Sequence, residues 1–300
     1  MSGHPAVFDR ALLMRRRRRA AALGPATFLI DRVAQDLADR LGAVLRRFDL
    51  AVDLASPADA PATALGRISV ISALITVCPS LAAFSARRPL SVVADEEVLP
   101  FRDGSLDLVV SALTLQFVND LPGTLIQIRR ALRPDGLFLA AMLGGDTLTE
   151  LRQAFAQAEA EIEGGISPRV APFVDIRDAG ALLQRAGFAL PVTDVDRLTV
   201  RYRSAFALMH DLRRMGATNP LIERRRAPLR RATLMRMAQV YAERFADPDG
   251  RLRATFEIVF LSGWAPHASQ QQPLRPGSAQ ARLADALGTR EISTGEKAGQ

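Results

Sequence analysis

The stretch SVVADEEVLPFRDGSLDLVVSALTLQFVNDLPGTLIQIRRALRPDGLFLAAML (91–143) decides the fold of this chain. It holds three short apolar runs of the buried-strand type and one helical stretch. The runs are 91–94, 106–111 and 137–143, and the helix is 121–132. Pro134, Asp135 and Gly136 predict a tight turn before the last run, with glycine supplying the positive φ. Strands that alternate with helices predict a parallel sheet covered on both faces.

The same alternation continues on both sides of this stretch. Residues 27–47 carry apolar side chains at spacings of three and four, which predict an amphipathic helix that begins after Thr27. Thr147 and Glu150 predict a capping box for a later helix. Further strands are expected at 48–54, 68–77 and 254–263, a two-stranded return at 188–202, and helices at 147–163, 175–186, 204–215 and 229–245. The predicted class is α/β, a doubly wound and mostly parallel sheet with an N-terminal helical arm and a C-terminal helical insertion.

Shifts in composition predict three parts of the chain. Residues 1–26 are a basic N-terminal arm. Residues 27–265 are the main domain, with the core sheet at about 48–145 and accessory helices at about 147–250. Residues 266–300 are rich in Gln, Pro, Ser and Gly, which predicts a disordered tail because so few apolar side chains cannot build a core.

Arginine carries nearly all of the positive charge, because Lys297 is the only lysine in a chain of net charge +7. Two readings stay open for this excess, a GC-rich coding bias and contact with an acidic partner or an anionic membrane. The runs at 15–19 and 224–231 are solvated faces on the first reading and a partner surface on the second. Nucleic acid is disfavoured, since aromatic residues make up only 6% and stand at expected core positions.

The reactive side chains are few. The single cysteine, Cys78, excludes an internal disulfide, and with three scattered histidines it argues against a metal site. Cys78 and His210 are expected to be packed residues. No apolar run approaches the ~20 residues that cross a bilayer. We expect a cytoplasmic bacterial protein, and peripheral attachment to the inner membrane stays open. The alternative is a mitochondrial matrix protein with an arginine-rich presequence, against which Asp9 argues.

Polar residues follow several of the predicted strands. In a doubly wound sheet, ligands bind outside the carboxyl ends of the strands, where a carboxylate accepts hydrogen bonds from a ribose or an exocyclic amine. We therefore predict a small-molecule pocket at these strand ends, with Asp95 at its mouth. The candidate binding residues are Asp53, Leu54, Ala55, Asp95, Glu96 and Ser111. Each acid has a structural alternative, as a helix cap or a solvated strand-end residue.

The stretch 92–143 resembles the second half of a class I S-adenosylmethionine-dependent methyltransferase domain. An acidic residue, an LPF motif, a D-x-S-x-D pattern and an LRPDG turn carry the resemblance, here as Asp95, Leu99, Pro100, Phe101, Asp103, Ser105, Asp107 and residues 132–136. It implies a Rossmann-like methyltransferase fold with S-adenosylmethionine as the cofactor. It also implies a contact between Asp95 and the adenine.

The chain to about residue 263 more narrowly resembles the complex I assembly methyltransferase-like family. Relatives of this family include the malonyl-carrier-protein methyltransferases of biotin synthesis. The supporting stretches are 8–10, 28–29, 41–48, 117–122 and 144–148. The resemblance implies a protein substrate, a respiratory complex I subunit, and either methyl transfer or arginine hydroxylation. A non-catalytic assembly or scaffold factor is the first alternative, and an O-methyltransferase of the biotin-pathway type is the second.

The chain departs from that pattern at two cofactor-binding positions. The family places a glycine-rich D-L-G-x-G-x-G loop after the first strand, because positive φ and a missing Cβ let the cofactor approach the backbone. Here residues 53–61 contain no glycine and two prolines. Cys78 and Pro79 stand where an acidic residue would bind the ribose. We therefore expect weakened or lost cofactor binding, and no residue identifies a catalytic base.

Overall fold

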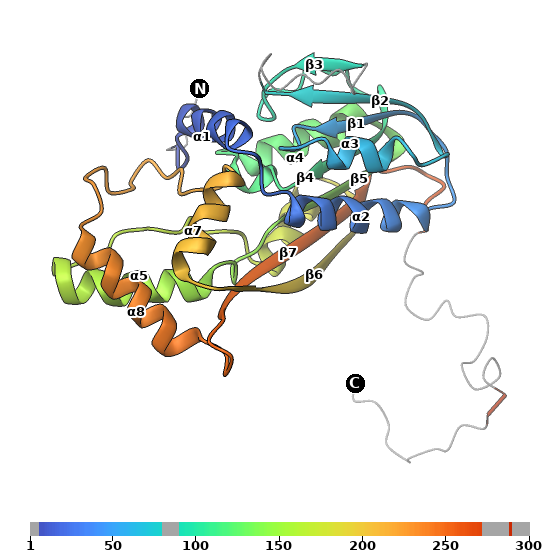
Figure 1. Cartoon of the computed structure of the whole chain (residues 1–300). Coiled ribbons are helices and arrows are strands. Elements are labelled where there is room, and N and C mark those ends of the chain that lie inside the picture. The colour runs from blue at the N-terminus through green and yellow to red at the C-terminus, as the bar shows by residue number, and fades with distance from the viewer. Residues whose placement is uncertain (1–5, 80–89, 272–287, 290–300) are drawn as a thin grey trace, which may run out of the picture. The chain divides into compact units, whose positions relative to one another are not determined.

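A computed structural model describes residues 6–79, 90–271 and 288–289 of the chain. In this part, seven strands form one mixed sheet in the order β3-β2-β1-β4-β5-β7-β6 (Figure 1). The strands are β1 (Phe48–Leu54), β2 (Ile71–Cys78), β3 (Ser91–Val93), β4 (Leu106–Ala112), β5 (Leu132–Leu143), β6 (Ala189–Tyr202) and β7 (Leu252–Trp264). Strands β1 to β5 pair in parallel, and β7 runs antiparallel to β5 and β6. The sheet confirms the predicted α/β class.

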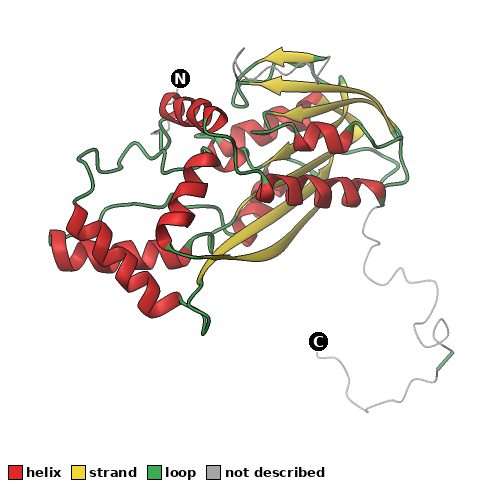
Figure 2. Cartoon of the chain, in the orientation of Figure 1, coloured by secondary structure: helices red, strands yellow, loops and turns green. Residues whose placement is uncertain are grey.

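Helices cover both faces of this sheet because successive side chains of a buried strand point to opposite sides. In β4, Leu108 packs into a core with α2, α5, α7 and α8, whereas Val109 packs into a second core with α4 and α6. Figure 2 shows the strands with helices packed around them. The helices are α1 (Arg10–Ala22), α2 (Phe28–Gly42), α3 (Ala60–Leu65), α4 (Leu121–Ala131), α5 (Thr149–Glu163), α6 (Ile176–Arg185), α7 (Ala205–Arg214) and α8 (Arg231–Phe245).

The predicted two-stranded return at 188–202 is wrong, because this segment is the single strand β6. It pairs with β7 along its length at the edge of the sheet. Its polar alternation comes from residues such as Asp194, which forms an ion pair of 2.5 Å with Arg40 of α2. Pro191 lies within the register shift between Ala189 and Val192, a place where an edge strand tolerates proline.

Residues 134–136 form a bulge within β5 and not a turn before the strand, and they have other roles than predicted. Asp135 adopts the left-handed conformation with φ 67°. Gly136 is needed for a close approach instead, since a Cβ there would lie 2.9 Å from the carbonyl oxygen of Arg133. The bulge also shifts the register of pairing with β4, and β5 begins at Leu132, before the predicted start at 137.

The predicted capping box at the start of α5 is also wrong. The helix begins at Thr149 after Leu148, which has φ 56° and offers no side-chain cap. Thr147 instead exchanges two hydrogen bonds of 3.1 Å with the backbone of Glu257 in β7. Glu150 accepts hydrogen bonds from the backbone N–H and the hydroxyl of Thr255. Tertiary contacts with β7 therefore replace the local cap.

The chain divides into two compact units, Met1–Pro266 and His267–Gln300. The basic arm belongs to the first unit, where it contains α1. Most of the predicted disordered tail, 266–300, lies outside the described residues. A helix long and apolar enough to cross a bilayer does not occur within 6–79, 90–271 and 288–289.

Candidate functional site

The site begins where β1 and β4 end side by side. β1 is flanked by β2 on one side and by β4 on the other, so the chain leaves these strands in opposite directions. Such a switch point opens a crevice at the carboxyl edge of the sheet. The apolar runs of β1 and β4 bury both strands, and they place Asp53 and Ser111 at this edge.

Three hydroxyl groups tie the two strand ends together, and we call Ser56, Ser111 and Thr114 the hydroxyl clasp. Ser111 donates to the carbonyl oxygen of Leu54 at 3.0 Å, and Thr114 donates to that of Ala55 at 2.7 Å. Ser56 donates to the fully buried carboxylate of Asp53 at 2.5 Å and accepts from the N–H of Ala112. The clasp fixes the loop that follows β1.

Ala55 has the left-handed backbone conformation expected of a glycine, with φ 56°. An alanine at such an angle costs about 1 kcal/mol or more, because its Cβ crowds the following carbonyl group. The clasp holds Ala55 there through the hydrogen bond from Thr114. The loop thus keeps the left-handed turn without glycine, but it retains a Cβ.

A cavity of about 960 Å³ lies beside this loop. Its walls come from residues 55–60, from Cys78 and Pro79 at the end of β2, and from α1 and α2. Asp59, the residue before α3, also lines it and offers a carboxylate. We call this space the larger cavity, and its volume lies within the range of small-molecule sites.

A second cavity of about 460 Å³ adjoins the first, and both share Arg17, Pro57 and Ala58 in their walls. We call it the smaller cavity. Apolar side chains form much of its surface, among them Leu29 of α2 and Phe155 of α5. Eight arginines also line it, whereas no aspartate or glutamate does among the described residues.

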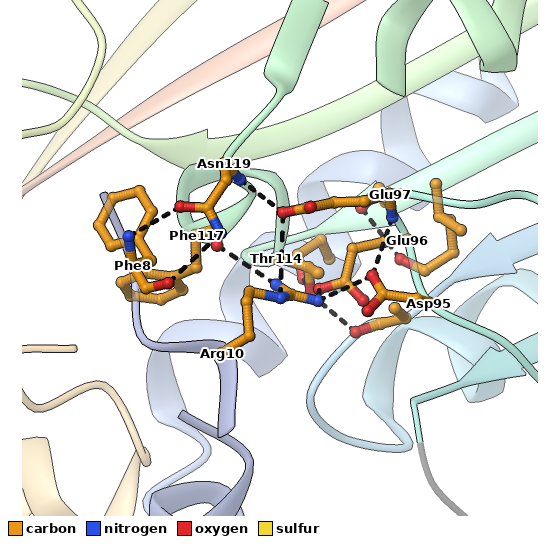
Figure 3. A network of polar contacts seen from close by, with 12 residues as sticks. Phe8, Arg10, Asp95, Glu96, Glu97, Thr114, Phe117 and Asn119 are labelled. Carbon is orange, nitrogen blue, oxygen red and sulfur yellow. Dashed lines mark hydrogen bonds and ion pairs between the residues drawn. The ribbon is translucent and has the colours of Figure 1, made fainter. Parts of the chain in front are cut away.

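Arg10 holds the acidic loop at 95–97 (Figure 3). Its guanidinium lies 2.7 Å from Glu96, which is fully buried, and 3.1 Å from Asp95. The neighbouring Glu97 lies 4.0 Å away. Burial lowers the pKa of Arg10, but the attraction of Glu96 and the other two carboxylates outweighs burial and leaves that pKa raised. The N-terminal arm therefore compensates the buried charge of Glu96 in the acidic loop.

Asn119 anchors the start of the arm to the same place (Figure 3). Its side-chain oxygen accepts hydrogen bonds of 2.8 Å from the backbone N–H groups of Val7 and Phe8. The backbone N–H of Asn119 donates to the carboxylate of Glu97 at 2.5 Å. The rings of Phe8 and Phe117 meet edge to face, 5.8 Å apart. Polar and aromatic contacts thus attach the arm to the loop after β4.

The predicted site residues fall into two groups. Asp53, Leu54, Ala55 and Ser111 lie together at the clasp, where Ala55 alone of these lines a cavity. Asp95 and Glu96 lie at the Arg10 cluster and line neither cavity; the side chain of Asp95 is 54% exposed. No group of three metal-binding side chains occurs among the described residues.

Several residues of the site were missed from sequence, among them Arg10, Arg17, Gln116 and Asn119. One signal was available for Arg10, because three consecutive acids at 95–97 require a nearby cation when one of them is buried. Arg17 and Gln116 lie far apart in sequence and both line the smaller cavity. No local sequence pattern indicates that these two residues line the same cavity.

S-adenosylmethionine, the cofactor implied by the resemblance, fits the larger cavity in three respects. The loop has the required left-handed residue at Ala55, and the cavity has room beside it. Asp59 supplies an acceptor for hydroxyl groups. The Cβ of Ala55 keeps the cofactor farther from the backbone than glycine would.

Comparison with known proteins confirms the resemblance. Residues 53–140 match the model of the methyltransferase domain family, beginning at Asp53. The human protein "Arginine-hydroxylase NDUFAF5, mitochondrial" is 41% identical over 280 residues, which cover 91% of this chain and 81% of that protein. The malonyl-[acyl-carrier protein] O-methyltransferase of Laribacter hongkongensis is 44% identical over 192 residues, which cover 64% of this chain and 62% of the enzyme.

Solved structures support the fold. A candidate methyltransferase from Bacillus halodurans has a TM-score of 0.53 at 13% identity, and the match covers 77% of this chain and 99% of that one. Identity this low indicates a shared fold only, so the reaction has to be inferred from the residues of the site.

Proposed function

Because the chain belongs to the family of the arginine-hydroxylase NDUFAF5 proteins, we propose that it is an enzyme that binds S-adenosylmethionine and modifies a subunit of respiratory complex I. The cofactor would lie in the larger cavity along the loop at 55–60. The substrate would enter the adjoining smaller cavity.

The observation that carries this proposal is the extent of the match. The methyltransferase model spans 53–140 alone, which leaves out α1, α2 and the accessory helices. The NDUFAF5 match covers 91% of the chain, so most of the elements that wall both cavities fall within it. The part of the chain that faces the substrate therefore resembles a protein-modifying enzyme.

The chain's own residues would mainly position the reactants. When bound, the cofactor supplies an electrophilic methyl group. The backbone at Ala55 and the carboxylate of Asp59 would orient it. Histidine, cysteine, aspartate and glutamate are absent from the described lining of the smaller cavity. Reaction there would depend on alignment of substrate and cofactor.

Calorimetric titration with S-adenosylmethionine tests the cofactor part. We expect binding in the micromolar range, weakened by the Cβ of Ala55. Thr63→Trp, an exposed substitution in α3 that places a large ring in the wall of the larger cavity, should abolish it. Binding that is absent or millimolar in the wild-type protein would contradict the proposal.

Deletion of the gene followed by mass spectrometry of complex I subunits tests the substrate part. In the deletion strain the modified peptide should lack one CH2 unit, the net gain when a methyl group replaces a hydrogen atom. Loss of one oxygen atom instead would indicate hydroxylation by dioxygen with a two-electron reductant, which the methyl group of the cofactor does not supply. Wild-type protein should restore the modification, and Thr63→Trp should not. If Thr63→Trp restores complex I assembly fully, the chain acts as a scaffold and not as an enzyme.

A second candidate is favoured by the higher identity to the malonyl-[acyl-carrier protein] O-methyltransferase, 44% over 64% of the chain. On that reading the acceptor is a carboxylate on a carrier protein. Growth of a biotin auxotroph that carries this gene would support it. Failure to grow, with the protein folded and expressed, would exclude this second candidate function.

A further inference from the structure

The smaller cavity contains arginines whose charges the protein does not neutralise. Four of its eight arginines form ion pairs with acidic side chains outside the cavity. Arg16 donates to a backbone carbonyl group in the loop after α7. Arg17, Arg19 and Arg213 form no ion pair with the residues that the structure describes. The lining of the cavity therefore has a net positive charge.

Two of these unpaired arginines lie at the opening of the cavity, and we call Arg19 and Arg213 the arginine rim. Arg19 comes from the last turn of α1 and Arg213 from the last turn of α7, and the two helices are in contact (Figure 1). Both side chains are exposed although they line the cavity, which places them at its mouth. The Nη1 atom of Arg17 is buried instead, in the wall that the two cavities share.

The positive charges around the mouth act on one another. Burial lowers the pKa of Arg16, and the charges of Arg224 and Arg19 lower it further against the opposing charge of Asp9. Like charges gathered in this way create a positive potential that attracts an anionic partner. Arginine donates paired hydrogen bonds to carboxylates and to phosphates. The rim alone therefore fits an acidic protein, a membrane or a nucleic acid.

Gln116 has the opposite chemical requirement inside the cavity. Its side chain is only 6% exposed, and its Oε1 atom has no hydrogen-bond partner among the described residues. A buried carbonyl oxygen needs an N–H or O–H donor. An ionised phosphate group would offer it only further acceptor oxygens. The occupant of the cavity therefore brings a donor to Gln116 and negative charge to the rim.

The aromatic part of the wall suits a long side chain. Phe117 and Phe173 both line the cavity, and their rings meet edge to face with centroids 6.2 Å apart. Aromatic rings pack against the alkyl stem of a long side chain, and their faces attract a guanidinium. A polypeptide meets all of these conditions when acidic residues flank a side chain that carries N–H donors.

We propose that an acidic segment of the substrate protein docks here, with its carboxylates on Arg19 and Arg213 and one donor-bearing side chain in the smaller cavity against Gln116. Carboxylates on the rim cancel its positive potential, so a cationic side chain enters as part of an acidic segment and not alone. The inference names the substrate class of the proposed function and rests on that function for the reaction. Docking itself needs no cofactor.

Calorimetry without cofactor tests the proposal on the full chain, with blocked peptides as probes. The acidic peptide has a central arginine between aspartate and glutamate residues, and the neutral peptide has asparagine and glutamine in their places. At low salt the acidic peptide should bind about tenfold more tightly, and the difference should shrink as salt screens the rim. Equal binding of the two peptides would overturn the proposal.

Arg19→Gln and Arg213→Gln locate the contact. Each should weaken the acidic peptide about threefold and should not weaken the neutral peptide. Arg185→Gln is the matched control, because it makes the same change of charge at an exposed position of α6 that lines neither cavity. If phosphatidylglycerol vesicles bind through Arg19 and Arg213 while the acidic peptide does not bind, the rim is a membrane contact and the proposal fails.

Gln116→Leu tests the donor inside the cavity. A third peptide has norleucine in place of the central arginine and therefore lacks its N–H donors. Gln116→Leu should weaken the acidic peptide about threefold and should not weaken the norleucine peptide. Its thermal midpoint should stay level or rise, because the substitution removes an unpaired buried polar group. Equal losses for both peptides, or no loss for either, would contradict the contact.

Failure of the docking and failure of the proposed function give different results. The peptides are measured without cofactor, so intact peptide binding with absent S-adenosylmethionine binding refutes the proposed function alone. Binding of S-adenosylmethionine without binding of the acidic peptide refutes the docking alone.

Discussion

Ala55 combines two properties that rarely occur together, a side chain and a left-handed backbone. We expect Ala55→Gly to raise the free energy of unfolding by about 1 kcal/mol, because glycine adopts this angle without strain. It should also tighten S-adenosylmethionine binding. Urea unfolding and calorimetry measure the two effects.

The matched control for Ala55→Gly is Ala62→Gly, which lies inside α3 at ordinary helical angles. There glycine should lower stability by about 1 kcal/mol. If both substitutions destabilise equally, the angle at Ala55 is not strained.

Arg10 compensates the fully buried carboxylate of Glu96. Arg10→Gln leaves that charge unpaired and should lower the free energy of unfolding by about 3 kcal/mol. Adding Glu96→Gln to this variant should recover part of the loss. Urea unfolding followed by circular dichroism measures both, with Arg15→Gln as the neutral control. A loss no larger than that of the control would contradict the role of Arg10.

At the scale of single residues, the sequence predicts which residues stand at the end of a strand better than it predicts what those residues contact. The run FDLAVDL ends the strand at Leu54, so Asp53 and Ala55 were placed correctly at the strand end. The interaction of Arg17 with the smaller cavity depends on how α1 packs, and no local pattern encodes it. The left-handed angle of Ala55 was expected only of glycine, because hydrogen bonds from residues distant in sequence hold it.

Among the elements, α5 and α8 pack side by side (Figure 1). Contacts between acidic and arginine side chains join the two helices. Arg236 of α8 hydrogen-bonds Glu161 and lowers the pKa of that carboxyl from 4.5 to about 2. Thr233, with Arg225 and Arg230, lowers the pKa of Glu163 as well. The folded state therefore binds these protons less readily than the unfolded state.

Stability should accordingly fall with acid in a defined window. The contribution of Glu161 is complete above about pH 4.5, its unfolded pKa, and is lost as the pH falls to about 2. Arg236→Gln should make the loss across this window smaller than in the wild-type protein. Arg185→Gln, an exposed change in α6, should leave it the same. Urea midpoints measured from neutral pH to pH 2 would show an unchanged slope in Arg236→Gln if the contact is irrelevant.

Elements with a clear apolar period were predicted best. β1 has the predicted bounds, and the apolar stripe of α2 packs on the sheet as expected. The predicted end of this helix at 47 is wrong, because α2 ends at Gly42 and Leu45 beyond it is fully exposed. The errors lie where tertiary contacts override local signals. β6 is continuous because β7 pairs along it, and Thr147 bonds to β7 in place of a helix end. α3 was missed because six residues give too short a period.

For the molecule as a whole, the two cavities share a positively charged wall at Arg17. A wall of this sign disfavours the sulfonium cation of S-adenosylmethionine relative to the uncharged thioether of S-adenosylhomocysteine. We therefore expect Arg17→Gln to narrow the ratio of the dissociation constants of these two nucleosides by about threefold or more. Calorimetry at low salt measures the ratio, with Arg15→Gln as the control. An unchanged ratio in Arg17→Gln would contradict this prediction.

α1 carries the two arginines on which these predictions depend. Arg10 and Arg17 are seven residues apart, which is two helical turns along one side and about 10 Å of helix axis. Because the helix backbone is stiff over this length, a translation of α1 as a whole that moves Arg10 away from the acidic loop also moves Arg17 at the wall between the cavities. The contacts of the acidic loop and the wall of the smaller cavity thus both depend on the position of α1.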